Sequence, residues 1–360
     1  MWPSTQVTKL LKIALPIIQA PMAGATTPEL IAAVSNSGGL GSLAAGYLTA
    51  DEMRIAIRQI RKLSNKPFAI NLFIPEKHYA TNKQVDQARK AVQASCEELN
   101  YVIDLIKQPY APPFEEQMAV ILEEKIPIFS FTFGLPPDNW IEKFKKNHIK
   151  LIGTATTLQE AKMLEEHEID LIVAQGSEAG GHRGTFIGKA EDGLTNISSL
   201  IPLLVDQINI PIIAAGGIMN AQNILSLLTL GASAIQMGTI FLTCTESGIH
   251  PLYKKALLTS IHDTTTLTRA FSGKLARGIT NKFINRMQTH EATILDYPIQ
   301  NALTTPMRKE ARKQSCIDFM SMWAGQAAYL CKELSAAQLI DELQHEVMLI
   351  LKNNPLDKYE

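Results

Sequence analysis

Eight short apolar segments, separated by stretches of helical periodicity, constrain the fold of this 360-residue chain more than any other feature. Most are continuously apolar, which is typical of strands buried on both faces of a parallel sheet. They cover residues 16–20, 39–43, 68–73, 127–131, 150–153, 171–175, 211–215 and 234–237. Amphipathic helical patterns lie between them at residues 28–37, 50–63, 158–167, 197–205 and 221–230. This alternation predicts an α/β protein, a (β/α)8 TIM barrel in preference to a doubly wound open sheet.

Two longer segments interrupt the alternation. Residues 74–126, after the third strand, contain a polar helical pattern over residues 82–106 and a break at Pro112-Pro113. Residues 245–315, after the eighth strand, form no obvious strand–helix unit. Both segments follow the carboxyl ends of strands, where barrels build their sites, so we interpret them as elaborations that cover a substrate. An unrelated insertion is the alternative for residues 245–315.

The chain therefore divides into three parts. We expect a barrel over residues 1–244, a smaller cap domain inserted after the eighth strand over residues 245–315, and a C-terminal segment over residues 316–360. The last segment has a helical pattern over residues 316–351 and is expected to pack back on the barrel.

Composition excludes several classes of protein. Apolar residues make up 46% of the chain and charged residues 19%, which provides for a sizeable core. The net charge is −1 with Lys and Arg spread along the chain, so neither nucleic acid nor an anionic membrane is an expected partner. No apolar run reaches the ~20 residues that span a bilayer, and no secretory signal begins the chain. The four cysteines form no C-x-x-C pair, which argues against a metal site or disulfide framework and fits a cytoplasmic protein.

A glycine-rich loop with one histidine follows the sixth strand. His182 is flanked by Gly180, Gly181 and Gly184, and such glycines let a backbone approach a flat ligand or a phosphate closely. A histidine at the end of a buried strand is placed to exchange a proton with a ligand above it. The alternative is a tight turn whose histidine caps a carbonyl. Glu178 is a second, lower-ranked candidate base, and the charge of Arg183 would hold the imidazole neutral if it lay close.

Two further glycine loops follow the last two strands. Gly216 and Gly217 come after the seventh strand, and Gly238 and Thr239 after the eighth. In barrels these loops commonly bind a phosphate through backbone N–H groups, and the Thr239 hydroxyl is a further donor. Tight βα turns are the alternative for each loop alone. No G-x-G-x-x-G motif opens a helix after an early strand, so a Rossmann dinucleotide domain is not supported.

Other residues at the strand ends would complete a pocket. Asn71 and Gln175 are amides in otherwise apolar strands, where they are either ligand contacts or satisfied core amides. Pro21, Met22 and Ala23 end the first strand and would place backbone and an apolar thioether against a ring system.

Taken together, residues 16–24 (PIIQAPMAG), 175–184 (QGSEAGGHRG), 211–218 (PIIAAGGI) and 236–241 (QMGTIF) resemble the nitronate monooxygenases, formerly called 2-nitropropane dioxygenases. The resemblance covers residues 14–244 and extends to residues 272–277. It implies a bound FMN, with flavin contacts at Asn71, Gln175, Gly180, Gly217, Gln236, Met237, Gly238 and Thr239, and a catalytic histidine at His182. Residues 296–301 resemble the region that closes the substrate pocket in the bacterial branch, which makes Tyr297 a candidate substrate contact.

Three functional hypotheses follow. The first is FMN-dependent oxidation of alkyl nitronates by O2 to a carbonyl product and nitrite, with His182 as general base for neutral nitroalkanes. The second is an FMN-dependent enoyl-acyl-carrier-protein reductase using a nicotinamide, because these enzymes share a similar histidine loop and phosphate site. The third is a barrel that binds flavin or phosphate without turnover, against which the presence of His182 counts.

Overall fold

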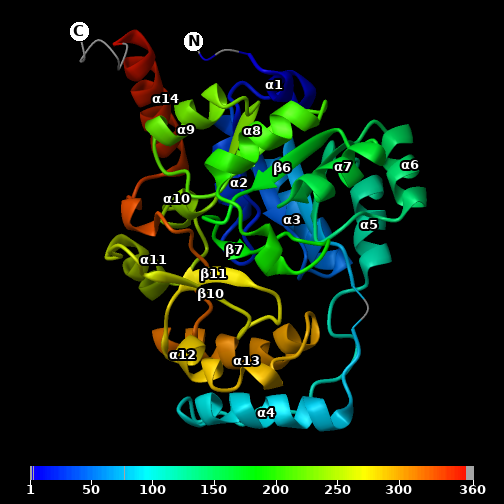
Figure 1. Cartoon of the computed structure of the whole chain (residues 1–360), viewed down its shortest axis with the longest axis vertical. Helices are drawn as coiled ribbons and strands as arrows, with labels where there is room; N and C mark the ends of the chain where they lie inside the picture. Colours follow the sequence, from blue (N-terminus) through cyan, green and yellow to red (C-terminus); the bar gives the residue numbers. More distant parts are fainter. Residues whose placement is uncertain (1, 3, 77, 354–360) are drawn as a thin grey trace.

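A closed barrel of eight parallel strands forms the body of the molecule (Figure 1). The structure is a computed structural model that describes residue 2, residues 4–76 and residues 78–353. The strands are β1 (Ile17–Gln19), β2 (Gly41–Ala44), β3 (Phe68–Phe73), β4 (Ile128–Thr132), β5 (Lys150–Ala155), β6 (Leu171–Gln175), β8 (Ile212–Ala215) and β9 (Ala234–Met237). They follow one another around the barrel in chain order. The predicted (β/α)8 fold and all eight predicted strands are confirmed.

The barrel closes between its first two strands. β1 and β2 share one bridge, between Ile18 and Leu40, and the Leu40 N–H donates to the Ile17 carbonyl at 2.9 Å. Helix α1 (Gln6–Leu11) precedes β1, and its Val7 and Leu11 pack against side chains in the barrel interior. The amino-terminal end of the barrel is therefore filled, and the opposite end is left for a site.

Helices form the outer layer of the barrel. They are α2 (Pro28–Asn36), α3 (Ala50–Leu63), α5 (Phe114–Glu123), α6 (Asp138–Lys146), α7 (Leu158–Glu166), α8 (Ile197–Gln207), α9 (Ala221–Thr229) and the short α10 (Thr239–Leu242). The five helices predicted from periodicity are confirmed to within two residues at each end. Threonine or asparagine side chains cap most of these, as Thr49 does for α3 by accepting from the Glu52 N–H at 3.3 Å. Their apolar faces and the outer faces of the strands form the largest core.

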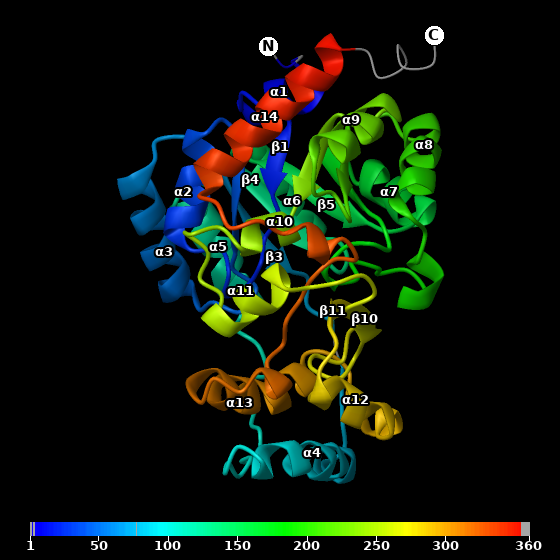
Figure 2. The same ribbon diagram turned by 90° about the vertical axis from the view of Figure 1, so that its left-hand side faces the viewer.

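A second layer, the cap, lies against the carboxyl ends of the strands (Figure 2). It contains α11 (Pro251–Leu258), β10 (Thr265–Thr268), β11 (Ala276–Ile279), α12 (Lys282–Gln288), the short 3-10 helix η2 (Glu291–Thr293) and α13 (Ile299–Lys313). β11 pairs with β7 (Gly181–His182), so the histidine loop is joined to the cap by a small antiparallel sheet. The cap has its own apolar core, separate from that of the barrel.

Helix α4 (Asn82–Glu97), from the segment after β3, packs on α12 and α13 of the cap. It ends at Glu97, so the sequence-based helix over residues 82–106 was too long. Asn100 adopts a left-handed conformation with φ of 49°, and the Gln93 side chain then accepts from the Ile103 N–H at 3.2 Å. Because these interactions turn the chain back beside α4, the helical pattern cannot continue.

The predicted C-terminal helix also begins later than expected, at Ala336. Residues 316–335 contain only the short 3-10 helices η3 (Ile317–Phe319) and η4 (Ala328–Leu330). Their backbone is used in tertiary pairing, as where the Ile279 N–H donates to the Met322 carbonyl at 2.8 Å. Helix α14 (Ala336–Lys352) then packs on α2 and α9 of the barrel.

The boundaries at residues 244 and 315 stay predictions. Within the described parts of the chain, no helix is both long and apolar enough to cross a membrane.

Glu160 fixes the loop after β6 to the barrel, and removing it should destabilise the fold. Its buried carboxylate accepts from the N–H groups of Thr156 at 2.6 Å, Phe186 at 2.5 Å and Ile187 at 3.0 Å. Glu160→Ala leaves these donors unpaired, so we expect a loss of about 2–4 kcal/mol in the free energy of unfolding, measured by urea denaturation. Glu166→Ala, on the exposed face of the same helix, is the control; an equal effect of both variants would contradict this role.

Candidate active site

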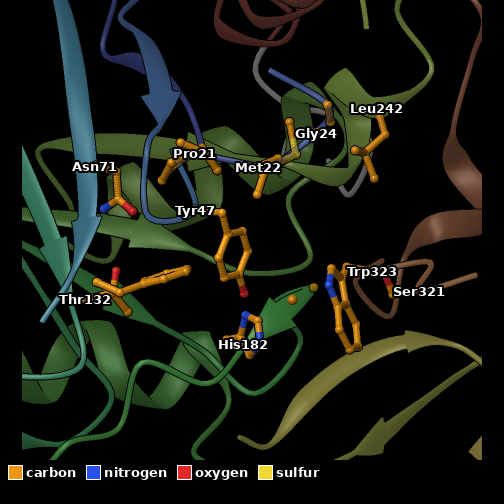
Figure 3. Close-up of a pocket in the computed structure, with 18 of the residues that line it drawn as sticks. Pro21, Met22, Gly24, Tyr47, Asn71, Thr132, His182, Leu242, Ser321 and Trp323 are labelled. Atoms are coloured by element: carbon orange, nitrogen blue, oxygen red, sulfur yellow. The ribbon is translucent and has the colours of Figure 1, made fainter. Parts of the chain in front are cut away.

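One large cavity, of about 680 Å³, lies at the carboxyl ends of the strands and reaches the cap. Figure 3 shows Asn71 and Thr132 on one side of it, Ser321 and Trp323 on the other, and the Tyr47 hydroxyl directed toward His182. A volume of this size suits a cofactor together with a small substrate.

The polar floor of the cavity follows from strand alternation. Inward-facing residues are apolar near the amino-terminal end of the barrel and polar at its carboxyl end. Asn71, which donates to the Ser130 hydroxyl at 3.0 Å, lies on this floor with Thr132, Thr154 and Gln236. Ser130, Thr132 and Thr154 were missed by sequence reasoning, although polar residues two apart at the end of an apolar strand are a readable signal.

Gln175 holds the histidine loop. Its amide donates to the His182 carbonyl at 2.9 Å and accepts from the Gly184 N–H at 2.8 Å. The amide nitrogen and the amide oxygen of Gln175 are therefore both hydrogen-bonded within the protein, as expected for a satisfied core amide. Gln175 also lines the cavity, together with the polar residues of its floor.

The guanidinium of Arg183 does not lie beside the His182 ring, although the two residues are adjacent in the sequence. Its side chain is 1% exposed, and its guanidinium donates to the carbonyls of Gly176, Gln175 and Gly193 at 2.5, 2.9 and 3.0 Å. Adjacent residues of an extended chain point to opposite sides, so His182, in β7, faces the cavity and Arg183, directly after β7, faces the interior. Arg183 therefore stabilises the loop from behind.

Glu178, the alternative base, also points away from the cavity. Both of its carboxylate oxygens accept from the Ile197 N–H at 3.1 Å, at the first residue of α8. A carboxylate is favoured at a helix N-terminus by the helix dipole. This places Glu178 in a capping role and leaves His182 as the titratable group of the loop that faces the cavity.

His182 is enclosed by aromatic side chains. Its ring lies 5.4 Å from Trp323, 5.8 Å from Phe133 and 5.9 Å from Phe73, measured between ring centroids. The side chain is partly accessible from the cavity and surrounded by protein elsewhere. Burial, with smaller contributions from the cations Arg308 and Lys274, lowers the pKa of His182 to about 3. The imidazole is therefore neutral at neutral pH.

Ser272 orients the imidazole. Its hydroxyl lies 2.8 Å from His182 Nε2, and it also interacts with the Lys274 backbone. The contact joins residues 90 positions apart in the chain. Ser272 lies in the segment 272–277 that the sequence resemblance singled out, which was the one signal for it.

The glycines after β8 and β9 form one wall of the same cavity. Gly216 and Gly217 have φ values of 132° and 66°, which an L side chain rarely adopts. The N–H groups of Gly217, Gly238 and Thr239 have no acceptor among the described residues. Thr239 Oγ1 accepts from the Gly325 N–H at 2.9 Å, which leaves its own proton free to donate. Three unpartnered amides and a hydroxyl donor fit a phosphate group.

The remaining predicted contacts also border the cavity. Pro21, Met22, Ala23 and Met237 line it beside Gly238, at which an added Cβ would lie 3.4 Å from Met22 Sδ. Gly180 is required by protein packing instead, because a Cβ there would lie 2.5 Å from the Gly325 nitrogen. Gly181, with φ of 74°, faces open space.

Tyr297 is buried in the aromatic cluster around His182 and is not among the residues that line the cavity. Its ring centroid lies 6.0 Å from that of Phe73 and 5.8 Å from that of Phe133. Its hydroxyl is hydrogen-bonded to Tyr47, and burial raises the pKa of Tyr297 well above its usual range. Tyr47, Phe73, Phe133 and Trp323 were not anticipated from sequence, because scattered aromatic residues carry no spacing signal.

The chain is similar to proteins of known family along almost its whole length. A family model described as nitronate monooxygenase matches residues 4–346. A probable nitronate monooxygenase from Staphylococcus saprophyticus is 44% identical over 94% of this chain and 96% of its own length. A nitroalkane oxidase from Streptomyces ansochromogenes superposes with a TM-score of 0.89 at 36% identity, over 96% of this chain and 99% of that chain. FabK from Thermotoga maritima superposes over both full chains with a TM-score of 0.78 at 30% identity.

Fold, cavity and these similarities together define an oxidoreductase barrel of a flavin-using class. More narrowly, the chain belongs to the nitronate monooxygenase family. The resemblance read from the sequence motifs is thereby confirmed.

Proposed function

We propose that this enzyme uses bound FMN and O2 to oxidise alkyl nitronates, and the parent nitroalkanes, to a carbonyl product and nitrite. The observation that carries the proposal is His182: a neutral imidazole facing a cavity whose other wall offers phosphate donors. The names of its relatives, nitronate monooxygenase and nitroalkane oxidase, support the same substrate class. The four free cysteines support a cytoplasmic location.

FMN fits the residues at this end of the barrel. The amides of Gly217, Gly238 and Thr239 would hold its phosphate, and Pro21, Met22 and Ala23 would lie along the ring system together with Asn71 and Gln236. The described residues contain no dinucleotide-type loop for a second phosphate–ribose unit, so FMN is preferred to FAD. When bound, FMN supplies the one-electron and oxygen chemistry that side chains lack.

His182 would act on neutral nitroalkanes. The α C–H bond breaks, the proton passes to the imidazole, and the electron pair spreads onto the nitro oxygens. Ser272 fixes the ring orientation, and the surrounding aromatic side chains exclude water. A nitronate has already lost this proton, so it needs His182 only for positioning.

The cap would set substrate size and access. Residues 245–315 supply Ile249, Tyr253 and Asn301 to the cavity lining, and Tyr297 packs behind it against Phe73. We therefore propose that this segment covers the substrate, with Tyr297 supporting the cavity wall. Helix α4, which lies outside this segment in the sequence, packs on its helices α12 and α13.

Enoyl-thioester reduction is the second candidate function, because FabK shares the fold along the full chain. The two candidates differ in the electron donor to the flavin. We expect anaerobic mixing of the pure protein with ethylnitronate to bleach the flavin absorbance at least tenfold faster than mixing with NADPH. Bleaching by NADPH alone would assign the protein to the reductases, and bleaching by neither would favour a non-catalytic barrel.

Gly238→Val should produce a folded protein with little flavin. The new side chain enters the space beside Ala20 and Met22, and it crowds the loop whose amides would hold the phosphate. Bound flavin is measured by absorbance after purification, and the released cofactor by chromatography, with circular dichroism to check the fold. Unchanged flavin content, or release of FAD, would show that the phosphate site is assigned wrongly.

His182→Asn should separate proton transfer from binding. General-base catalysis is worth ~10²–10⁴-fold, so turnover of nitroethane should fall by about this factor while oxidation of ethylnitronate falls far less. The pKa of about 3 also predicts that wild-type kcat/KM for nitroethane shows no acid limb from His182 between about pH 5 and 8, because protonation begins only as pH falls toward 3. Equal losses on both substrates would assign His182 to positioning alone.

A further inference from the structure

Arg308, on α13, is a cation in the cavity wall with no carboxylate partner among the described residues. All of its hydrogen bonds use Nη2, which donates to the Asn301 carbonyl at 3.1 Å, to Asn301 Oδ1 at 2.8 Å and to Thr305 Oγ1 at 2.8 Å. Nε is buried and has no acceptor among the described residues. The guanidinium therefore keeps hydrogen-bonding capacity while lining the cavity.

The groups that face Arg308 are phenols. Burial lowers the pKa of Arg308, and the groups that act on its charge are Tyr47 and Tyr297, which are neutral at neutral pH because burial raises the pKa of each. No carboxylate of the described chain offsets this charge.

Two other cations near His182 are satisfied. Lys274 Nζ lies 2.7 Å from Glu76 Oε1 and 4.4 Å from the centre of the Phe133 ring. Arg183 is bound to three carbonyls behind the histidine loop.

Lys309 and Arg312 also line the cavity and have no carboxylate partner among the described residues, but both are exposed. Of these three cations, Arg308 is the least exposed one and the one whose charge acts on His182.

A cation that is largely enclosed by protein and has no partner is costly, and an anion beside it removes much of that cost. The cavity is large enough for a small oxyanion next to a cofactor. Guanidinium hydrogen bonds to oxyanions are about twice as strong as neutral ones, so such a site discriminates strongly between an anion and its neutral form.

We propose that Arg308 binds the negatively charged oxygens of the substrate, placing the nitronate group between itself and His182. The inference rests on the proposed function and adds to it a residue that recognises the reacting group. For a neutral nitroalkane, the electron pair released from the α C–H bond accumulates on the oxygens that Arg308 holds, while the proton goes to His182.

The arrangement also reconciles a weak base with proton abstraction. Arg308 disfavours the imidazolium form of His182, and an oxyanion bound to Arg308 offsets that repulsion. The base then becomes stronger as the nitronate forms, and the product of proton transfer is an ion pair of imidazolium and nitronate.

Nitrite, a planar anion that shares the O–N–O group of a nitronate, is the probe. Nitrite is titrated into the flavin-loaded wild type, Arg308→Met and Arg308→Lys, and binding is followed by flavin absorbance and calorimetry. Losing a charged hydrogen bond should weaken binding on the order of 10–100-fold in Arg308→Met, with an intermediate loss in Arg308→Lys. Lys313→Met, which removes an exposed cation from the same helix, should bind nitrite as the wild type does.

Equal nitrite affinity in the wild type and Arg308→Met would overturn the proposal, and so would an equal loss in Lys313→Met. If Arg308→Met does not retain flavin, Arg308→Lys decides: wild-type affinity there would assign the cation to the flavin instead. Oxidation of ethylnitronate by the wild type is scored separately. If the wild type does not oxidise ethylnitronate but nitrite binding depends on Arg308, the proposed function is wrong and the anion site stands. If oxidation is normal but nitrite binding does not depend on Arg308, the proposed function stands and the anion site is wrong.

Discussion

Parallel pairing of eight strands is the constraint on which the rest of the structure depends. It places every strand's carboxyl end on one face, so residues from β3, β4, β5, β6 and β9 converge on one floor. Alternation then decides which side chains point inward, and α1 fills the other end. The glycine loops that follow β8 and β9, and the cap, are placed at this same face because they follow the carboxyl ends of the strands.

The histidine loop shows how much protein is needed to present one imidazole. Arg183 and Glu178 bind main-chain groups behind the loop, Gln175 ties its two sides together, and Glu160 anchors the chain that follows. From the sequence, Glu178 was a candidate base, Arg183 a charge that could act on the imidazole, and Gln175 either a ligand contact or a core amide. They are instead the support that lets His182 face the cavity in a fixed orientation.

The polar and charged side chains that act on His182 come from the cap. Ser272, Lys274 and Arg308 lie at least 90 residues further along the chain, yet Ser272 contacts the imidazole and the two cations act on its charge. The short sheet of β7, β11 and β10 makes this possible, because it joins the histidine loop to the cap through backbone hydrogen bonds. A barrel without this pairing would keep the floor and the phosphate wall but lose the control of the base.

The sequence by itself determined the barrel, because strand burial, helix periodicity and glycine loops are local patterns with a fixed physical meaning. It likewise marked His182, Gly217 and Gly238, whose place at strand ends follows from that order. Only the tertiary structure decided which neighbours act on His182, since Arg308 and Trp323 carry no local signal and Arg183 carries a misleading one. It also decided the bounds of two helices. The Ile103 N–H bonds to the Gln93 side chain after α4 has ended, and the segment before α14 pairs with the cap, where the Met322 carbonyl accepts from the Ile279 N–H.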